Sequence, residues 1–123
     1  MRILLSIKPE FVKKIFSGEK KYEFRKTVFK DASVKKVVIY ACKPVSKIVG
    51  EFSIDTIIED DPKILWKRTH DYSGINETIF KEYFKGKEKG YAIKVKKCEE
   101  YSQPFSLEKL GIKCAPQSFM YLN

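Results

Sequence analysis

The side chains best suited to binding a polar ligand are concentrated in one segment, residues 18–25, which reads GEKKYEFR. Glu23 and Arg25 lie two residues apart, so on a strand they share one face and can pair or hold a common ligand. Lys20 has the opposite parity in a regular strand, but a turn at Gly18 could rotate it toward them. An arginine offers a planar fork and a lysine offers a mobile point charge, which together suit a phosphate or the edge of a base.

The same strand, expected over residues 20–26, also has an apolar face. Tyr22 and Phe24 are predicted to point into the core, whereas Lys21 lies on the polar face and adds charge at the rim of a site. The alternative is an ordinary exposed strand face, on which an ion pair contributes only ~0–1 kcal/mol. Spacing alone favours this second interpretation.

Positive charge is unevenly distributed along the chain. The sequence carries a formal net charge of +9, and six of those nine charges fall within residues 1–30. A concentrated basic region suggests a polyanionic partner, most simply nucleic acid or a nucleotide. A lysine-rich surface that only keeps the protein dissolved is the competing explanation.

Several classes of site are disfavoured. Cys42, Cys98 and Cys114 are widely separated and form no C-x-x-C pair, which argues against a disulfide framework or a zinc site and predicts a cytoplasmic protein. His70 is the only histidine, so histidine-based metal binding and catalysis have little support.

The acidic run that ends at Asp61 precedes a proline and therefore indicates the start of a helix rather than a metal site. The N-terminus reads neither as a signal peptide nor as a membrane span. We therefore expect no metal, no cofactor and no membrane partner.

Hydrophobic periodicity indicates a mixture of strands and short helices in one domain spanning residues 1–123. Helices are expected to begin at Pro9, at Pro62 and after Asn76, and a glycine inside the longest strand, Gly50, predicts a bulge or bend. Strands are expected over residues 3–7, 20–26, 37–42, 47–58, 90–98 and 102–105. This pattern predicts a small α+β domain built on a curled or closed sheet, and it does not fix the strand order or the oligomeric state.

The motif G-x-K-x-x-E-x-R, formed here by Gly18, Lys20, Glu23 and Arg25, resembles the signature of the activating signal cointegrator homology (ASCH) domain. The segments LLSIKPE, VVIYA, VGEF, GYAIK and PQSFMYL extend the resemblance over nearly the whole chain. It implies a PUA-like fold, a small β-barrel with two or three flanking short helices. It also implies a cleft at one end, lined by the motif residues, for RNA or a modified nucleoside.

The C-terminal tail adds three candidate ligand contacts. Gln117 and Ser118 offer an amide and a hydroxyl, and Phe119 offers a ring on which a base could stack. Phe119 and Tyr121 share strand parity, so a core edge strand is the alternative.

One branch of the resembled family hydrolyses the amide of N4-acylated cytidine, and some members have been linked to ribonuclease activity. In that branch a threonine stands where this chain has Glu23, the lysine acts as its base, and a second acid follows. Here Asp71 and Glu77 are the candidates for that acid. Glu23 offers no hydroxyl for an acyl intermediate, and its charge is expected to raise the pKa of Lys20.

We therefore predict a protein that binds RNA or a nucleoside in a basic cleft. An enzyme using Lys20 and Glu23, acting on RNA or on a modified nucleoside, is the first alternative. A regulatory module that docks an acidic protein partner is the second.

Overall fold

A computed structural model describes residues 1–122, over which the chain forms six strands, three α-helices and two 3-10 turns. In chain order the elements are β1 (Arg2–Ile7), α1 (Pro9–Ser17), β2 (Tyr22–Arg25), β3 (Lys36–Ala41), β4 (Lys47–Asp60), α2 (Pro62–Thr69), η1 (His70–Tyr72), α3 (Glu77–Tyr83), β5 (Gly90–Phe105), η2 (Leu107–Leu110) and β6 (Phe119–Leu122).

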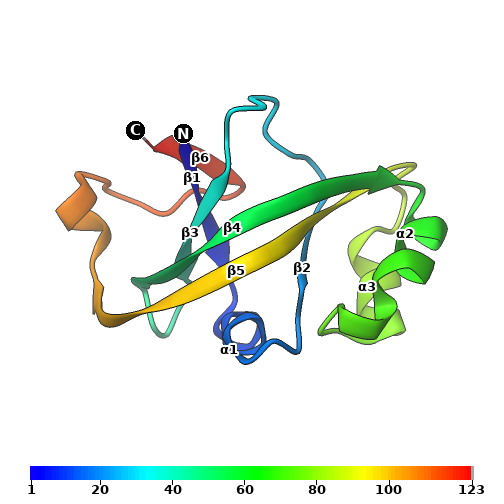
Figure 1. Ribbon diagram of the computed structural model, residues 1–123, viewed down its shortest axis with the longest axis horizontal. Coiled ribbons are helices and arrows are strands. Elements are labelled where there is room, and N and C mark those ends of the chain that lie inside the picture. Colours follow the sequence, from blue (N-terminus) through cyan, green and yellow to red (C-terminus); the bar gives the residue numbers. More distant parts are fainter. Residues whose placement is uncertain (123) are drawn as a thin grey trace.

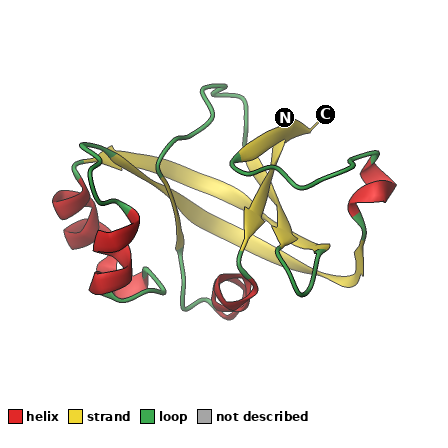
Figure 2. Cartoon of the chain, turned by 180° about the vertical axis from the view of Figure 1, so that it is seen from behind, coloured by secondary structure: helices red, strands yellow, loops and turns green. Residues whose placement is uncertain are grey.

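All six described strands belong to one sheet, in the order β2-β5-β4-β3-β1-β6. The neighbours β1 and β3 are parallel, and every other pair in this sheet is antiparallel. The two long strands β4 and β5 span the molecule, with α2 and α3 at one end and η2 at the other (Figure 1). Figure 2 shows α1 between these two ends, below the sheet.

The expectation of an α+β fold is confirmed, but the expectation of a closed β-barrel is wrong. In the described part of the chain, the edge strands β2 and β6 do not pair with each other. The reason lies in their lengths, since each has four residues and β6 pairs with β1 only as far as Leu5. Beyond Leu5, a side chain rather than a backbone ladder connects β2 to β1: Nη2 of Arg25 donates to the carbonyl of Ser6 at 2.7 Å. The sheet is therefore open.

Local signals placed the start of each α-helix and the end of α1 correctly. Pro9 begins α1, and Gly18 ends it in the left-handed conformation, at φ 88°. The side chains of Asp61 and Asn76 accept hydrogen bonds from backbone N–H groups in the first turns of α2 and α3. The bulge expected at Gly50 is also present, since the β3–β4 and β4–β5 registers both shift beside it.

One predicted break is absent. Residues 102–105 were expected as a separate short strand, whereas they form the end of β5, which continues to Phe105 opposite Ile48. The long partner β4 pairs with β5 at both Glu100 and Phe105, and the register shifts between these two positions. Local sequence cannot reveal such a partner.

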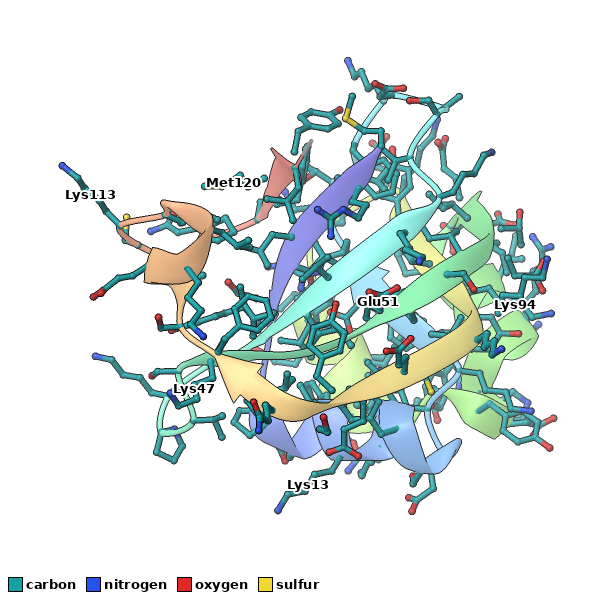
Figure 3. The ribbon with its side chains drawn as sticks, turned by 60° about the vertical axis from the view of Figure 1, so that its left-hand side comes forward. Lys13, Lys47, Glu51, Lys94, Lys113 and Met120 are labelled. Carbon is teal, nitrogen blue, oxygen red and sulfur yellow. The ribbon has the colours of Figure 1, made fainter. Side chains whose placement is uncertain are left out.

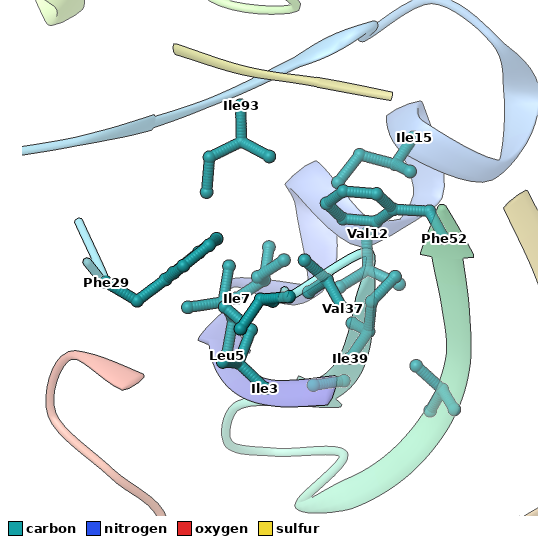
Figure 4. Close-up of a cluster of buried hydrophobic side chains, with 13 residues drawn as sticks. Ile3, Leu5, Ile7, Val12, Ile15, Phe29, Val37, Ile39, Phe52 and Ile93 are labelled. Carbon is teal, nitrogen blue, oxygen red and sulfur yellow. The ribbon is translucent and has the colours of Figure 1, made fainter. Parts of the chain in front are cut away.

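The main core lies between the curled sheet and α1. Val12 and Ile15 of α1 face strand residues that include Ile39 and Phe52 (Figure 4). A second cluster joins α2 and α3 to β2 and β5 through Phe24, Leu65, Phe80, Phe84 and Ala92. This second cluster anchors the two helices beside the segment that carries the predicted site.

Candidate functional site

Side chains from four elements surround a pocket of about 210 Å³ at the end of the sheet where β2 lies. Three of them, Lys20, Glu23 and Arg25, are the motif residues expected to form a polar floor. The remaining lining residues are Ser6, Lys8, Phe11, Phe24, Ile75, Ile79 and Tyr83. Three cations and one carboxylate therefore share a small pocket whose other walls are mainly apolar.

Lys20 is the most unusual residue of the pocket, because its side chain is almost completely buried, with 2% of its surface exposed. Its Nζ donates to the carbonyl of Ser73 at 2.7 Å. The same ammonium lies 5.1 Å from the ring centre of Phe11 and 4.8 Å from that of Phe24. One carbonyl and two aromatic faces thus replace much of the water that would surround an exposed lysine.

Burial dominates the acidity of Lys20. Desolvation lowers the pKa of its ammonium to about 8, while Glu23 acts in the opposite direction and Lys14 and Arg25 lower it further. Glu23 acts on this pKa in the expected direction, but its attraction is smaller than the effect of burial, so the net change is a lowering. With a pKa of about 8, roughly a tenth of the Lys20 side chains are uncharged at pH 7 and able to accept a proton.

The loop between η1 and α3 fixes the stem of Lys20. Gly74 adopts φ +71°, and a Cβ atom built there would lie only 2.6 Å from Cβ of Lys20. Nζ of Lys14 donates to the carbonyl of Gly74 at 2.9 Å, and the Ser73 hydroxyl donates to the carbonyl of Ile75 at 2.8 Å. The sequence predicted only a loop here; the one available signal was the Ser-Gly pair, which is typical of turns.

Glu23 and Arg25 form the expected pair, with Oε2 and Nη2 3.0 Å apart and both side chains largely buried. Arg25 is held from a second side by the carbonyl of Ser6. Within residues 1–122, Nε of Arg25 is buried without a hydrogen-bond partner. An unpaired buried donor destabilises a folded protein by about 1–3 kcal/mol, and a ligand oxygen would relieve this if it reached the group.

The other motif candidates lie outside the pocket lining. Gly18 makes the turn that directs Lys20 inward and does not itself face the pocket. Lys21 is exposed, and its Nζ lies 4.1 Å from the ring centre of Tyr72, while its backbone N–H donates to the Tyr72 carbonyl. Lys21 is thus placed near the edge of the site rather than in its floor.

The tail residues divide into two groups. Gln117 and Ser118 are exposed, and the carbonyl just before them, on Pro116, accepts a hydrogen bond of 2.8 Å from the hydroxyl of the pocket residue Ser6. Phe119 instead packs its ring edge-to-face on Phe29, at a centroid distance of 5.9 Å, in the edge strand β6. The tail approaches the pocket wall without lining the pocket.

Neither candidate for a distal acid lines the pocket among the described residues. Asp71 is exposed and lies 3.3 Å from Nδ1 of His70. Glu77 pairs with Lys81 at 3.4 Å and lines a different groove. The apolar walls that sequence reasoning missed, Phe11, Ile75, Ile79 and Tyr83, come from three separate segments, and no local pattern connects them.

Within residues 1–122, no group of three or more His, Cys, Asp or Glu side chains is placed to hold a metal ion. No helix in the same range is long and apolar enough to cross a membrane.

Comparisons with known proteins support a common fold. Residues 2–116 match the family model described as "Domain of unknown function (DUF365)". An "ASCH domain-containing ribonuclease" of Zymomonas mobilis is 32% identical over 98% of this chain and 83% of its own length. A crystal structure of ASCH from Zymomonas mobilis superposes with a TM-score of 0.91 at 30% identity, covering 99% of this chain and 87% of the other. The "Large ribosomal subunit protein uL22" of Ureaplasma parvum is 29% identical over 98% of this chain but only 39% of its own length.

The burial of Lys20 predicts a specific pH dependence of stability. The pKa is about 8 in the folded state and near 10.5 when the side chain is exposed, so the unfolded chain binds more protons between these values. The free energy of unfolding should therefore rise with pH in this range. Relative to Lys20→Met, which keeps an apolar stem, the wild type should gain about 2 kcal/mol between pH 7 and pH 10, measured by urea unfolding. Parallel pH profiles of the two proteins would contradict this burial.

The loop contact predicts that Gly74→Ala displaces Lys20. Gly86 offers a matched control, because it has a similar φ of +78° while, among the described residues, nothing lies within 4 Å of an added Cβ. Both changes should strain the backbone, but only Gly74→Ala should raise the pKa of Lys20 toward 10.5, as measured by NMR titration of isotope-labelled lysine. A pKa that stays near 8 in Gly74→Ala would show that the loop does not position Lys20.

Proposed function

The chain belongs to the family described as Domain of unknown function (DUF365) and is an ASCH-like domain, and from this premise we propose that it binds RNA in the pocket lined by Lys20, Glu23 and Arg25. The observation that carries the proposal is the convergence of three cations and one carboxylate in a single pocket, in a chain with a net charge of +9. Membership of the PUA-like superfamily and a cytoplasmic location belong to the same proposal.

The size of the pocket limits what it can hold. Pockets for drug-sized ligands occupy roughly 300–1,000 Å³, whereas this one occupies about 210 Å³. It therefore suits part of a nucleotide, either one phosphate or one base edge, and the rest of the RNA lies outside. Sequence-specific RNA recognition commonly uses bases splayed out of single strands, which fits a small pocket of this kind.

Each polar residue of the floor has a distinct role in this proposal. Arg25 presents its guanidinium to a phosphate or a base edge, in an orientation fixed by Glu23 and by the Ser6 carbonyl. Lys20 contributes positive charge from a low-dielectric position. Gln117 and Ser118 contact the part of the RNA that lies outside the pocket, since the hydrogen bond between Ser6 and Pro116 brings this segment to the pocket wall.

RNA cleavage is a second candidate function, favoured by the lowered pKa of Lys20 and by the similarity to the ASCH domain-containing ribonuclease of Zymomonas mobilis. Uncharged Lys20 would accept the proton of a ribose 2′-hydroxyl as its oxygen bonds to phosphorus. The bond from phosphorus to the 5′ oxygen breaks, and this oxygen takes a proton from water. Protonated Lys20 then returns a proton to the hydroxide that is left, which restores the uncharged amine. Arg25 would stabilise the negative charge that develops on the phosphoryl oxygens.

Hydrolysis of N4-acylated cytidine has less support from the geometry. Glu23 would have to activate water in that reaction, but its carboxylate is engaged by Arg25 at 3.0 Å. Docking of an acidic protein partner is the remaining alternative, and the binding experiment below separates it from RNA.

RNA binding should depend steeply on salt and on Arg25. Arg25→Ala should weaken binding of a fluorescently labelled single-stranded RNA by about 10- to 100-fold, because it removes charged hydrogen bonds. It should also lower the slope of log affinity against log salt by about 1, as measured by anisotropy. Lys113→Ala, which removes one exposed charge from the end of the molecule that carries η2, is the control. Absence of binding to single-stranded and structured RNA at low salt would overturn the proposal, and crosslinking that recovers only an acidic protein would favour the docking alternative.

Cleavage by Lys20 predicts a characteristic pH profile. With Lys20 as the base, the rate should rise with pH and level off above about 8, where the uncharged amine predominates. Lys20→Met should reduce the rate by at least about 10²-fold, whereas Lys113→Met, which removes an exposed charge at the end of the molecule that carries η2, should change it little. Gel analysis of a labelled RNA measures both. If the Lys20→Met protein cleaves RNA normally, Lys20 is not the base of the reaction. If the wild type releases acetate from N4-acetylcytidine, the activity is amide hydrolysis instead.

A further inference from the structure

A second concave surface lies on the other side of α3 from the pocket. The groove between α2 and α3 has a volume of about 600 Å³. Three aromatic residues lie in it, Trp66, Phe80 and Phe84. Four lysines surround them, Lys63, Lys67, Lys81 and Lys87. The RNA-binding proposal above assigns no role to any of these residues.

The charges of the groove favour an anionic occupant. Its two acidic residues are already engaged: the carboxylate of Asp61 caps α2, and that of Glu77 pairs with Lys81. Lys63 and Lys67 stand four residues apart on one face of α2, where like charges repel and destabilise the helix. Within the described residues, Lys63 and Lys67 form no ion pair, and neither does Lys87 across the groove. An anion between them would remove this repulsion.

The aromatic residues provide a firm surface for a flat ligand. Phe80 and Phe84 are 1% and 2% exposed, and their ring centres lie 4.8 Å apart. Trp66 is only partly buried, and its ring centre lies 4.9 Å from that of Phe80, which supports it from below. A partly exposed indole packed on a buried ring, next to several lysines, combines the two features that bind single-stranded nucleic acid, namely base stacking and phosphate attraction.

The helix α3 is the common wall of both concave surfaces. Ile79 and Tyr83 line the pocket, whereas Phe80 and Phe84 line the groove. A helix with its side chains is about 10 Å wide, so a strand that occupies the pocket needs to extend only a short way to reach the groove. Continuity with the pocket is what favours RNA over an acidic peptide as the occupant.

We propose that the α2–α3 groove is a second nucleotide subsite, in which a base stacks on Trp66 while Lys63, Lys67 and Lys87 contact the phosphates of a single-stranded RNA that crosses α3 from the pocket. This inference rests on the proposed RNA-binding function. It assigns a substrate class to the groove, an extended single strand rather than a single nucleotide.

Trp66 is the only tryptophan of the chain, so its fluorescence reports on the groove alone. Titration of the wild type with an unlabelled eight-nucleotide single-stranded RNA should quench or shift this fluorescence at the same concentrations that change the anisotropy of the labelled RNA. Lys63→Glu combined with Lys67→Glu should weaken binding about tenfold or more and lower the salt slope by more than about 1. Both lysines are exposed, so the fold should be retained.

The matched control reverses two exposed lysines at the opposite end of the molecule, Lys109→Glu with Lys113→Glu, which makes the same change in net charge. Lys113 projects outward from the surface there (Figure 3). The control pair should weaken binding much less than the groove pair. In addition, an RNA of two nucleotides is too short to reach the groove from the pocket, so the groove variant and the wild type should bind it with equal affinity.

The possible failures are distinguishable. If the labelled RNA does not bind at all, the proposed function itself is wrong. If RNA binds and Arg25→Ala weakens it, but Trp66 fluorescence is unchanged and the two charge-reversal pairs behave alike, the RNA function stands and the groove subsite is rejected. A Trp66 response to polyglutamate but not to RNA would assign the groove to an acidic protein partner and would also overturn this inference.

Discussion

The organisation of the site depends on one buried ammonium group. Lys20 is enclosed by the rings of Phe11 and Phe24 and is held by a single strong hydrogen bond to the carbonyl of Ser73. A charge in such a place is unfavourable unless surrounding groups compensate for the lost water. Gly74 allows the loop that carries the Ser73 carbonyl to lie against the stem of Lys20, because a side chain at position 74 would collide with that stem.

The open sheet makes room for this arrangement. Because β6 pairs with β1 only as far as Leu5, it does not pair with Ser6. Instead the carbonyl of Ser6 accepts from Arg25, whose guanidinium also pairs with Glu23. The same guanidinium therefore joins two parts of the sheet and lines the pocket, which couples the shape of the pocket to the position of β2.

The two helices at the end of the long strands serve both the core and the surface. Phe80 and Phe84 pack on Phe24, the residue that also lies beneath the ammonium of Lys20. Through this packing the floor of the α2–α3 groove and the wall of the pocket rest on the same buried cluster. A change in the packing of α3 would therefore alter both the pocket and the α2–α3 groove.

The sequence by itself determined the helix ends at Pro9 and Gly18, most of the strands, the ASCH-like motif and the pairing of Glu23 with Arg25, because these depend on neighbours close in the chain. It could not determine that the sheet stays open, that β5 continues to its end beside β4, or that the loop at Gly74 encloses Lys20. These features depend on contacts between segments far apart in the chain. The pKa of Lys20 shows the difference most clearly, since the adjacent Glu23 was visible in the sequence, whereas the burial that outweighs it exists only in the folded protein.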